Sequence, residues 1–345
     1  MRTEPSPYDL LFACIIVMML LRILLNRRMI LTTPYFILIS VLGLTNLLSV
    51  VNSVDHLLSV RYALITLYLV LTSIALVEYM RSKAAVRLVV TGYVVGAIFA
   101  AFAGLLGFVG GEFGQLFMYN SERVSAYFKD PNVFAAYMVP PILLFGGMMI
   151  RRSTDRRRYF SMSVLLGLLV AAFFFAYSRA AYLNMAVAVL THVTILAFKR
   201  RVSVLRKLML SYVIAAAVTI TLTISLAQVP TLLQRLQLYQ EYDIVRFEVQ
   251  RKVLPSIISN GTASLSSWLG IGPGEFEAKF SYASHSLYLR TISENGILGF
   301  GSLALLIILS LSKSFYTVKA SKEHECYSSE ILAALVGTLV NSLFI

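Results

Sequence analysis

The stretch LVVTGYVVGAIFAAFAGLLGFV at residues 88–109 contains no charged residue along its whole length. A helix of about 20 apolar residues crosses a hydrocarbon core of ~30 Å, because each residue rises ~1.5 Å. Lipid admits only helices and closed barrels, since backbone polar groups find no other partners there. A barrel would show alternating segments of about 10 residues. This stretch is longer and more uniformly apolar, so it predicts a transmembrane helix.

Similar apolar runs recur along the chain and predict ten transmembrane helices. They lie at residues 8–25, 32–51, 60–79, 88–109, 132–150, 160–177, 180–198, 208–227, 286–312 and 329–345. Of the 345 residues, 58% are hydrophobic and only 14% charged, against about 25% charged in average soluble domains. The composition excludes a soluble globule, a disordered chain and a disulfide scaffold. We expect an all-α polytopic protein that forms a single integral membrane domain over residues 1–345.

The basic residues are distributed unevenly between the two faces that these ten runs define. The loops after the first, third, fifth, seventh and ninth runs hold 18 Lys and Arg residues against three acidic ones, Asp155, Glu323 and Glu325. The positive-inside rule makes this face cytoplasmic and places both termini outside. The net charge of +13 then reflects membrane orientation, and no nucleic-acid partner is needed to explain it.

The two ends of the chain and its two cysteines carry few signals. The first run follows a single basic residue, Arg2, and no small-residue cleavage site, which favours a membrane anchor over a removable signal. Cys14 lies in a predicted span and Cys326 in a predicted cytoplasmic loop. This separation predicts no disulfide, and the spacing indicates no metal site.

Two segments on the predicted outer face are longer than a simple connection requires. In GGEFGQLFMYNSERVSAYFKDP, residues 110–131, apolar side chains recur at helical spacing and predict a helix lying in the membrane interface. Asp130 can cap the next helix, with Pro131 at its first position. The second segment, residues 228–285, predicts a folded extracytoplasmic loop with a helix at 243–258.

Three glycines in GIGPGEF, residues 270–276, invite a nucleotide-binding interpretation. The dinucleotide fingerprint G-x-G-x-x-G requires a glycine where Glu275 stands, and it requires a preceding strand that is not predicted here. The pattern therefore predicts a tight turn in place of a phosphate-binding loop.

His285 joins the large outer loop to the ninth apolar run. An imidazole with an ordinary pKa of ~6.5 can accept a proton near neutral pH, which makes His285 a candidate general base. A histidine that only anchors the end of the helix is the alternative. Inside the same run, Glu294-Asn295-Gly296 predicts either a local break of the helix or an interfacial helix start.

Two outer arginines complete the candidate set. Arg179 lies in YSRAAY, residues 177–182, between two apolar runs. A charge deep in a bilayer costs at least ~2.5–3.5 kcal/mol, so such an arginine lines a polar cavity, has a partner, or snorkels to the interface. Arg246 lies on the predicted 243–258 helix, where a solvated face is the default reading. Guanidinium groups bind diphosphate oxygens through paired hydrogen bonds, which fits a lipid-linked diphosphate donor.

Five short motifs over residues 130–300 resemble, in the same order, those of the O-antigen ligase and O-antigen polymerase family of bacterial membrane glycosyltransferases. They are DPNVFAAY (130–137), SRAAYL (178–183), IVRFEVQRKVLP (244–255), GIGPGEF (270–276) and HSLYLRTISENGILGF (285–300). The chain departs from the family pattern in two respects. Alanine replaces the common glycine after Arg179, and there are fewer predicted helices than members usually show.

The resemblance implies a GT-C-type enzyme of the bacterial cytoplasmic (inner) membrane with an extracytoplasmic active face. It implies transfer of glycan from an undecaprenyl-diphosphate-linked donor to the hydroxyl of a glycan or lipid-glycan acceptor, without metal or cofactor. Carried over by position, His285 activates the acceptor hydroxyl, and Arg179 and Arg246 bind the donor diphosphate. Further supporting residues are Arg251, Asp130, Asn132, Tyr288 and Glu294.

Several alternatives stay open at the level of sequence. The family contains both ligases and polymerases, and the motifs are shared by the two. A transporter or flippase of lipid-linked glycan is the main alternative from another class, although its usual inverted repeat is not found here. A membrane scaffold without chemistry leaves the basic residues of the outer loop unexplained.

Overall fold

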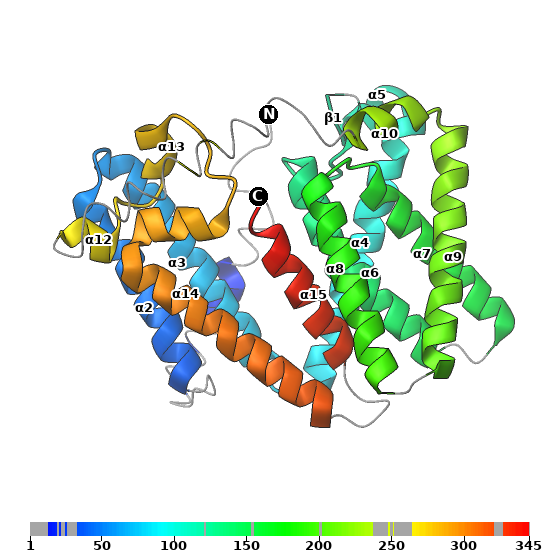
Figure 1. Ribbon diagram of the computed structural model, residues 1–345, viewed down its shortest axis with the longest axis horizontal. Coiled ribbons are helices and arrows are strands. Elements are labelled where there is room, and N and C mark those ends of the chain that lie inside the picture. Colours follow the sequence, from blue (N-terminus) through cyan, green and yellow to red (C-terminus); the bar gives the residue numbers. More distant parts are fainter. Residues whose placement is uncertain are drawn as a thin grey trace. The chain divides into compact units, whose positions relative to one another are not determined.

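The computed structural model describes residues 13–18, 21, 25, 33–120, 122–152, 155–199, 202–236, 248, 251, 264–320 and 327–344. Within these ranges the chain is helical apart from one short antiparallel ribbon and the connecting turns (Figure 1). Eight of the helices are long and apolar enough to cross a membrane. The all-α, multi-pass prediction is confirmed, and exposed leucines on these helices suit contact with membrane lipid.

The eight long helices are α2 (Thr33–Ser49), α3 (His56–Tyr79), α4 (Lys83–Val109), α6 (Pro131–Arg152), α7 (Arg156–Phe174), α8 (Arg179–Phe198), α9 (Val202–Ser225) and α14 (Leu287–Ala320). The shorter elements are η1 (Val50–Asn52), α5 (Gly111–Gln115), α10 (Val229–Leu236), α12 (Leu265–Leu269), α13 (Glu275–Phe280) and α15 (Ser328–Asn341). Strands β1 (Met118–Tyr119) and β2 (Arg123–Val124) form the ribbon.

The first and last predicted spans differ from the other eight. Most of the first run, residues 8–25, lies outside the described residues. The last run, 329–345, yields α15 with 14 residues, fewer than the ~20 that cross a bilayer core. A tenth full-length span is therefore not observed at this end.

The predicted interfacial helix over residues 110–131 is wrong beyond Gln115. Only α5 is helical, and the chain then turns into the β1–β2 ribbon, where Met118 pairs with Val124. The helical spacing of its apolar side chains is overridden because glycine disfavours helix and because these side chains pack against glycines of α4. A Cβ atom at Gly104 would overlap Val124, and one at Gly107 would overlap Met118.

The start of α6 agrees with the sequence. The helix begins at Pro131, and the Asp130 carboxylate accepts a hydrogen bond from the Asn132 N–H at 2.6 Å. The predicted cap with proline at the first helical position is confirmed, because proline lacks the N–H that a first-turn residue leaves unpaired.

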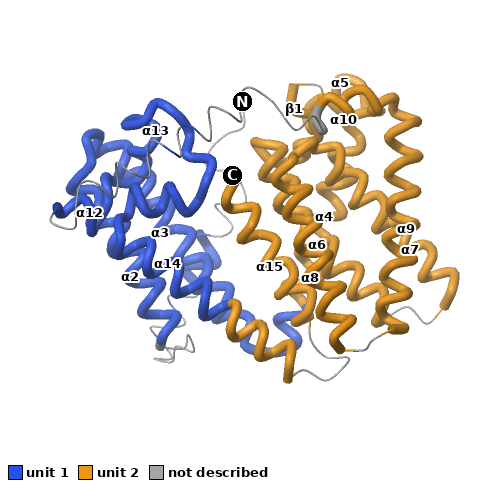
Figure 2. Tube along the Cα trace, in the orientation of Figure 1, with its two compact units in different colours: residues 1–87, 240–310 blue, residues 88–239, 311–345 orange. Residues whose placement is uncertain are grey.

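The described helices belong to two compact units where the sequence suggested a single membrane domain (Figure 2). Unit 1 comprises residues 1–87 and 240–310, and unit 2 comprises 88–239 and 311–345. Each unit combines two separate stretches of the chain. Helices α4 and α14 each contribute residues to both units. Hydrophobic run lengths predict spans but carry no information about which spans pack together.

Unit 2 is built from helices α6–α9 and α15, which pack closely through small residues. A Cβ atom at Gly167 of α7 would lie 2.7 Å from Val218 of α9, and α15 approaches α8 at Gly337. At one end of this unit, Arg151 of α6 pairs with Glu330 of α15 at 2.7 Å. The Glu330 carboxylate is buried, so the pair fastens α15 to α6.

Replacing Arg151 with Met is expected to destabilise the protein by about 3–5 kcal/mol, because it leaves the buried Glu330 carboxylate without its partner. The double variant Arg151→Met/Glu330→Gln should recover much of that loss. Thermal unfolding of the detergent-solubilised chain measures both, with Arg156→Met at the exposed start of α7 as control. An Arg151→Met midpoint equal to that of the control would contradict a stabilising pair.

Candidate functional site

A break in α14 organises the polar residues of unit 1. Gly296 has φ 64° and ψ −167°, so the helix is interrupted there and divides into a first half, residues 287–295, and a longer second half. Of the two sequence interpretations of Glu294-Asn295-Gly296, the break is confirmed. A helix end leaves its last carbonyl groups without helical partners, and in lipid each such group must find another.

The turn at residues 270–274 supplies those partners. The backbone N–H of Ile271 donates to the Ser293 carbonyl at 2.9 Å, and that of Gly272 donates to the Glu294 carbonyl at 3.2 Å. The glycine-rich turn therefore caps the first half of α14.

Glycine is required on both sides of this contact. A Cβ atom at Gly270 would overlap the carbonyl of Glu294, and one at Gly296 would overlap the carbonyl of Trp268. Both glycines also have positive φ, 84° and 64°, a region that side chains disfavour. The prediction of a tight turn is confirmed, and its role here is close packing of backbone on backbone.

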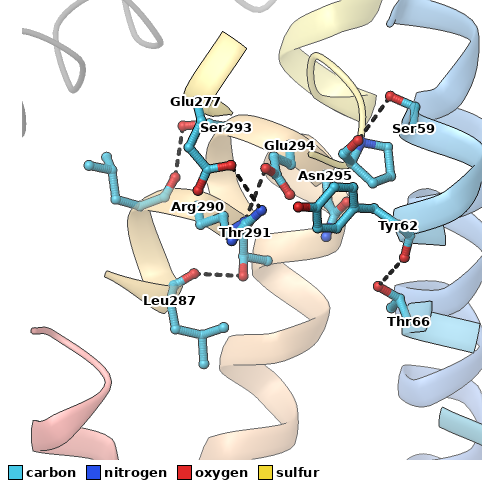
Figure 3. Close-up of polar contacts among 12 residues, drawn as sticks. Ser59, Tyr62, Thr66, Glu277, Leu287, Arg290, Thr291, Ser293, Glu294 and Asn295 are labelled. Carbon is cyan, nitrogen blue, oxygen red and sulfur yellow. Dashed lines mark hydrogen bonds and ion pairs between the residues drawn. The ribbon is translucent and has the colours of Figure 1, made fainter. Parts of the chain in front are cut away.

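Helix α3 and the segment before it hold the turn from the other side. The Ser59 hydroxyl donates to the Pro273 carbonyl at 2.9 Å (Figure 3). The Asn52 amide donates to the Gly270 carbonyl at 2.9 Å. The buried Glu275 carboxylate, directly after the turn, accepts from the Asp55 N–H at 2.7 Å. Sequence reasoning assigned no role to Glu275, whose contacts lie more than 200 residues away in the chain.

Arg290 connects three elements around the break. Its Nε donates to Glu294 at 3.1 Å, and its Nη2 lies 3.5 Å from the Glu277 carboxylate of α13. Its guanidinium also lies 5.6 Å from the centre of the Tyr62 ring of α3, within cation–π range. Figure 3 shows these side chains converging beside the first half of α14. Arg290 stands within the motif at 285–300, but no sequence signal singled it out.

The Glu294 carboxylate has partners beyond Arg290. It is buried and accepts hydrogen bonds from the backbone N–H groups of Gly274 and Phe276. Its neighbour Asn295 accepts a hydrogen bond from the Asn46 amide of α2 at 2.9 Å. Glu294, predicted as a supporting residue, thus joins the broken helix to the turn.

His285 lies two residues before the first half of α14 in a left-handed backbone conformation, with φ 45°. That region is uncommon for residues other than glycine and carries strain, which the surroundings must hold in place. The flanking Ser284 and Ser286 are buried, and the Ser286 hydroxyl accepts the Leu289 N–H at 3.4 Å. His285 and Tyr288 are themselves half-buried.

Arg179 is the first residue of α8 in unit 2 and is half-buried. It follows Tyr177, which has φ 49° and lies between two candidate spans. Burial raises the pKa of the Tyr177 phenol to about 12, and its hydroxyl donates to the Gln228 side chain at 3.1 Å. The helix start that carries Arg179 is therefore anchored to the segment after α9.

Arg123, which lies in the segment 110–131 where an interfacial helix was predicted, ties this region together. Its Nε donates to the Ala176 carbonyl at 2.9 Å, and its Nη2 lies 3.0 Å from Asn132 Oδ1 and 3.3 Å from the Tyr177 carbonyl. One sequence feature could have indicated a role for Arg123: it is an arginine on the predicted outer face, where membrane topology does not favour arginine.

The predicted site residues fall in both units. Tyr288 and Glu294 lie on the first half of α14 in unit 1, with His285 two residues before it, and Asp130, Asn132 and Arg179 belong to unit 2. Arg246 lies outside the described residues, and Arg251 is helical and exposed. In the described ranges, His, Cys, Asp and Glu side chains form no group of three that could hold a metal ion.

Comparison with known proteins gives no family assignment: no protein-family model matches the chain, and no curated protein matches it.

Gly270→Ala is expected to destabilise the protein by about 1–3 kcal/mol, because the turn would have to move away from the break and the positive φ would be strained. Gly301→Ala, in the second half of α14, is the control, because a Cβ atom at that position meets nothing within 4 Å. Thermal unfolding midpoints of the two variants measure the difference. Equal midpoints would show that the turn does not rest on the break as described.

Proposed function

We propose that this protein is a GT-C-type glycosyltransferase of a bacterial cytoplasmic membrane, acting on the extracytoplasmic face. The observation that carries the proposal is the strained backbone of His285 at the start of a short, firmly capped helical segment. Strain of this kind persists where surrounding structure holds it and is concentrated at functional sites. The motif resemblance supplies the reaction class.

In the proposed reaction, glycan moves from an undecaprenyl-diphosphate-linked donor to an acceptor hydroxyl. The hydroxyl oxygen forms a bond to the anomeric carbon while its proton passes to the His285 imidazole. The bond from that carbon to the diphosphate oxygen breaks, and undecaprenyl diphosphate leaves with the electron pair. Arg179 and Arg246 are proposed to bind the diphosphate and to stabilise its growing negative charge. The reaction needs neither metal nor cofactor.

The supporting residues have narrower proposed roles. Asp130 and Asn132 fix the start of α6 and the position of Arg123. Tyr288 lies three residues after His285, in the first turn of α14, and Arg251 is a second cation near Arg246 in sequence. The acceptor, a glycan or a lipid-glycan, decides between polymerase and ligase. Mass analysis of the product distinguishes them by a ladder of repeat units or a single transferred block.

A transporter or flippase of lipid-linked glycan is the second candidate, because α14 is interrupted at Gly296. Transporters use the free backbone groups of such interrupted helices to bind substrates and ions. Here the carbonyls of Ser293 and Glu294 already accept hydrogen bonds from the glycine turn, which favours the enzyme. Flux of lipid-linked glycan without a new glycosidic bond would favour the transporter.

In proteoliposomes supplied with undecaprenyl-diphosphate-linked glycan, His285→Ala is expected to lower transfer by about 10²–10⁴-fold, the usual contribution of a positioned base. Arg179→Gln and Arg246→Ala should each lower transfer as well, because the leaving diphosphate loses a charge partner. His56→Ala is the control, an exposed histidine in the same unit as His285. Wild-type transfer rates in His285→Ala and Arg246→Ala would remove the roles assigned to these residues.

The pH dependence of transfer provides a separate test of the base. An imidazole base works only when neutral, and imidazole ordinarily protonates near ~6.5. Transfer is therefore expected to fall as the pH is lowered from 8 to 5. A rate that stays constant over that range would argue against a titrating His285.

A further inference from the structure

We propose that Arg290 is a positioning residue that fixes the helical segment following His285, an inference that rests on the proposed transfer reaction. Arg290 acts through Glu294, Glu277 and Tyr62, and it does not itself contact the reacting groups.

The segment is too short to hold its own conformation. Residues 287–295 form only about two and a half turns before the break at Gly296, and isolated helices below ~12–15 residues are marginal. Only Ser286 separates His285 from this segment. The position of the His285 backbone therefore depends in part on contacts that the segment makes with the rest of unit 1.

The glycine turn fixes the end of the segment that lies farther from His285. Backbone hydrogen bonds reach Ser293 and Glu294 there, and the Glu294 carboxylate accepts two further backbone N–H groups from Gly274 and Phe276. Contacts at one end leave the segment free to tilt and to rotate about its axis. A second attachment nearer to His285 is needed to set its orientation.

Arg290 provides that second attachment. It lies midway along the segment, five residues after His285, and contacts Glu277 of α13 and the Tyr62 ring of α3. Its pair with Glu294 at 3.1 Å links this attachment to the capped end. A planar guanidinium can donate to carboxylates through its edge while its face lies against an aromatic ring. A lysine ammonium has no such planar face.

Charge favours positioning over an alternative in which Arg290 binds the donor diphosphate. Its guanidinium already contacts two carboxylates, Glu294 and Glu277, and the buried Glu275 lies in the adjoining turn. One positive charge between two negative ones repels a further anion. Arg290 therefore holds structure at this position.

The test compares His285 reactivity and transfer kinetics in the full-length protein. The main variant is Arg290→Gln/Glu294→Gln, which removes both charges together so that no buried carboxylate loses its partner. The matched control is Glu78→Gln/Arg81→Gln, another ion pair of unit 1, in which the buried carboxylate lies near the end of α3 and the half-buried arginine lies in the turn that follows. Diethyl pyrocarbonate labels histidines, and mass spectrometry follows its rate at His285 with His56 as internal reference.

In the main variant, labelling of His285 is expected to become at least about threefold faster as the segment opens locally. The kcat for transfer should fall about 10–100-fold with KM nearly unchanged, because misplacement by ~1 Å costs up to ~10²-fold. In the single variant Arg290→Lys, both values should lie between those of the wild type and those of the main variant. The control pair should leave both values at those of the wild type.

The positioning role is overturned if the main variant labels and turns over as the control pair does. If labelling shifts as expected but the wild-type protein transfers no glycan, the proposed function fails while the structural role of Arg290 stands. If the main variant does not fold, Glu277→Gln decides, since this carboxylate is exposed at the edge of the cluster. It should speed His285 labelling about twofold through loss of one contact, and no change would overturn the role.

Discussion

The close contact between the glycine turn at 270–274 and the break in α14 is the constraint on which unit 1 depends. A helix interrupted within a membrane span leaves carbonyl groups that lipid cannot satisfy. Two backbone N–H groups of the turn satisfy them, at Ser293 and Glu294. That solution works only if the two backbones come closer than any side chain allows, which explains glycine at Gly270 and Gly296. Helix α3 then holds the turn in place through Ser59.

Two buried carboxylates of unit 1 lie at or beside this contact. Glu275 and Glu294 lie inside the unit, and both accept backbone N–H groups, so hydrogen bonds compensate their burial. Glu294 is compensated by Arg290 as well. Arg290 extends this network to α3 and α13. His285 therefore lies just before a short helical segment whose far end and middle are both attached. Local order of this kind suits a residue whose function requires a defined direction.

Unit 2 reaches stability by a different route. Small residues bring its helices together, as at Gly167 and Gly337, and two arginines satisfy polar groups at the helix ends. Arg151 pairs with Glu330 of α15, whereas Arg123 donates to carbonyl groups that precede α8. The ribbon that carries Arg123 replaces the helix expected from the spacing of apolar residues. Its register follows from contact with the glycines of α4, which is a property of the packed unit.

The sequence by itself determined the features that depend on neighbouring residues. Eight spans follow from the length of apolar runs, the start of α6 follows from Asp130 and Pro131, and the glycine pattern predicted the turn. The sequence offered the break at Gly296 as one of two interpretations. The motif resemblance also directed attention to His285. Only the tertiary structure decided the ribbon in place of a helix at 110–131, the division into two units, and the partners of Arg123 and Arg290. Glu275 bonds to a backbone group 220 residues away, and a contact of that separation leaves no trace in any local pattern, because it arises only when distant helices pack.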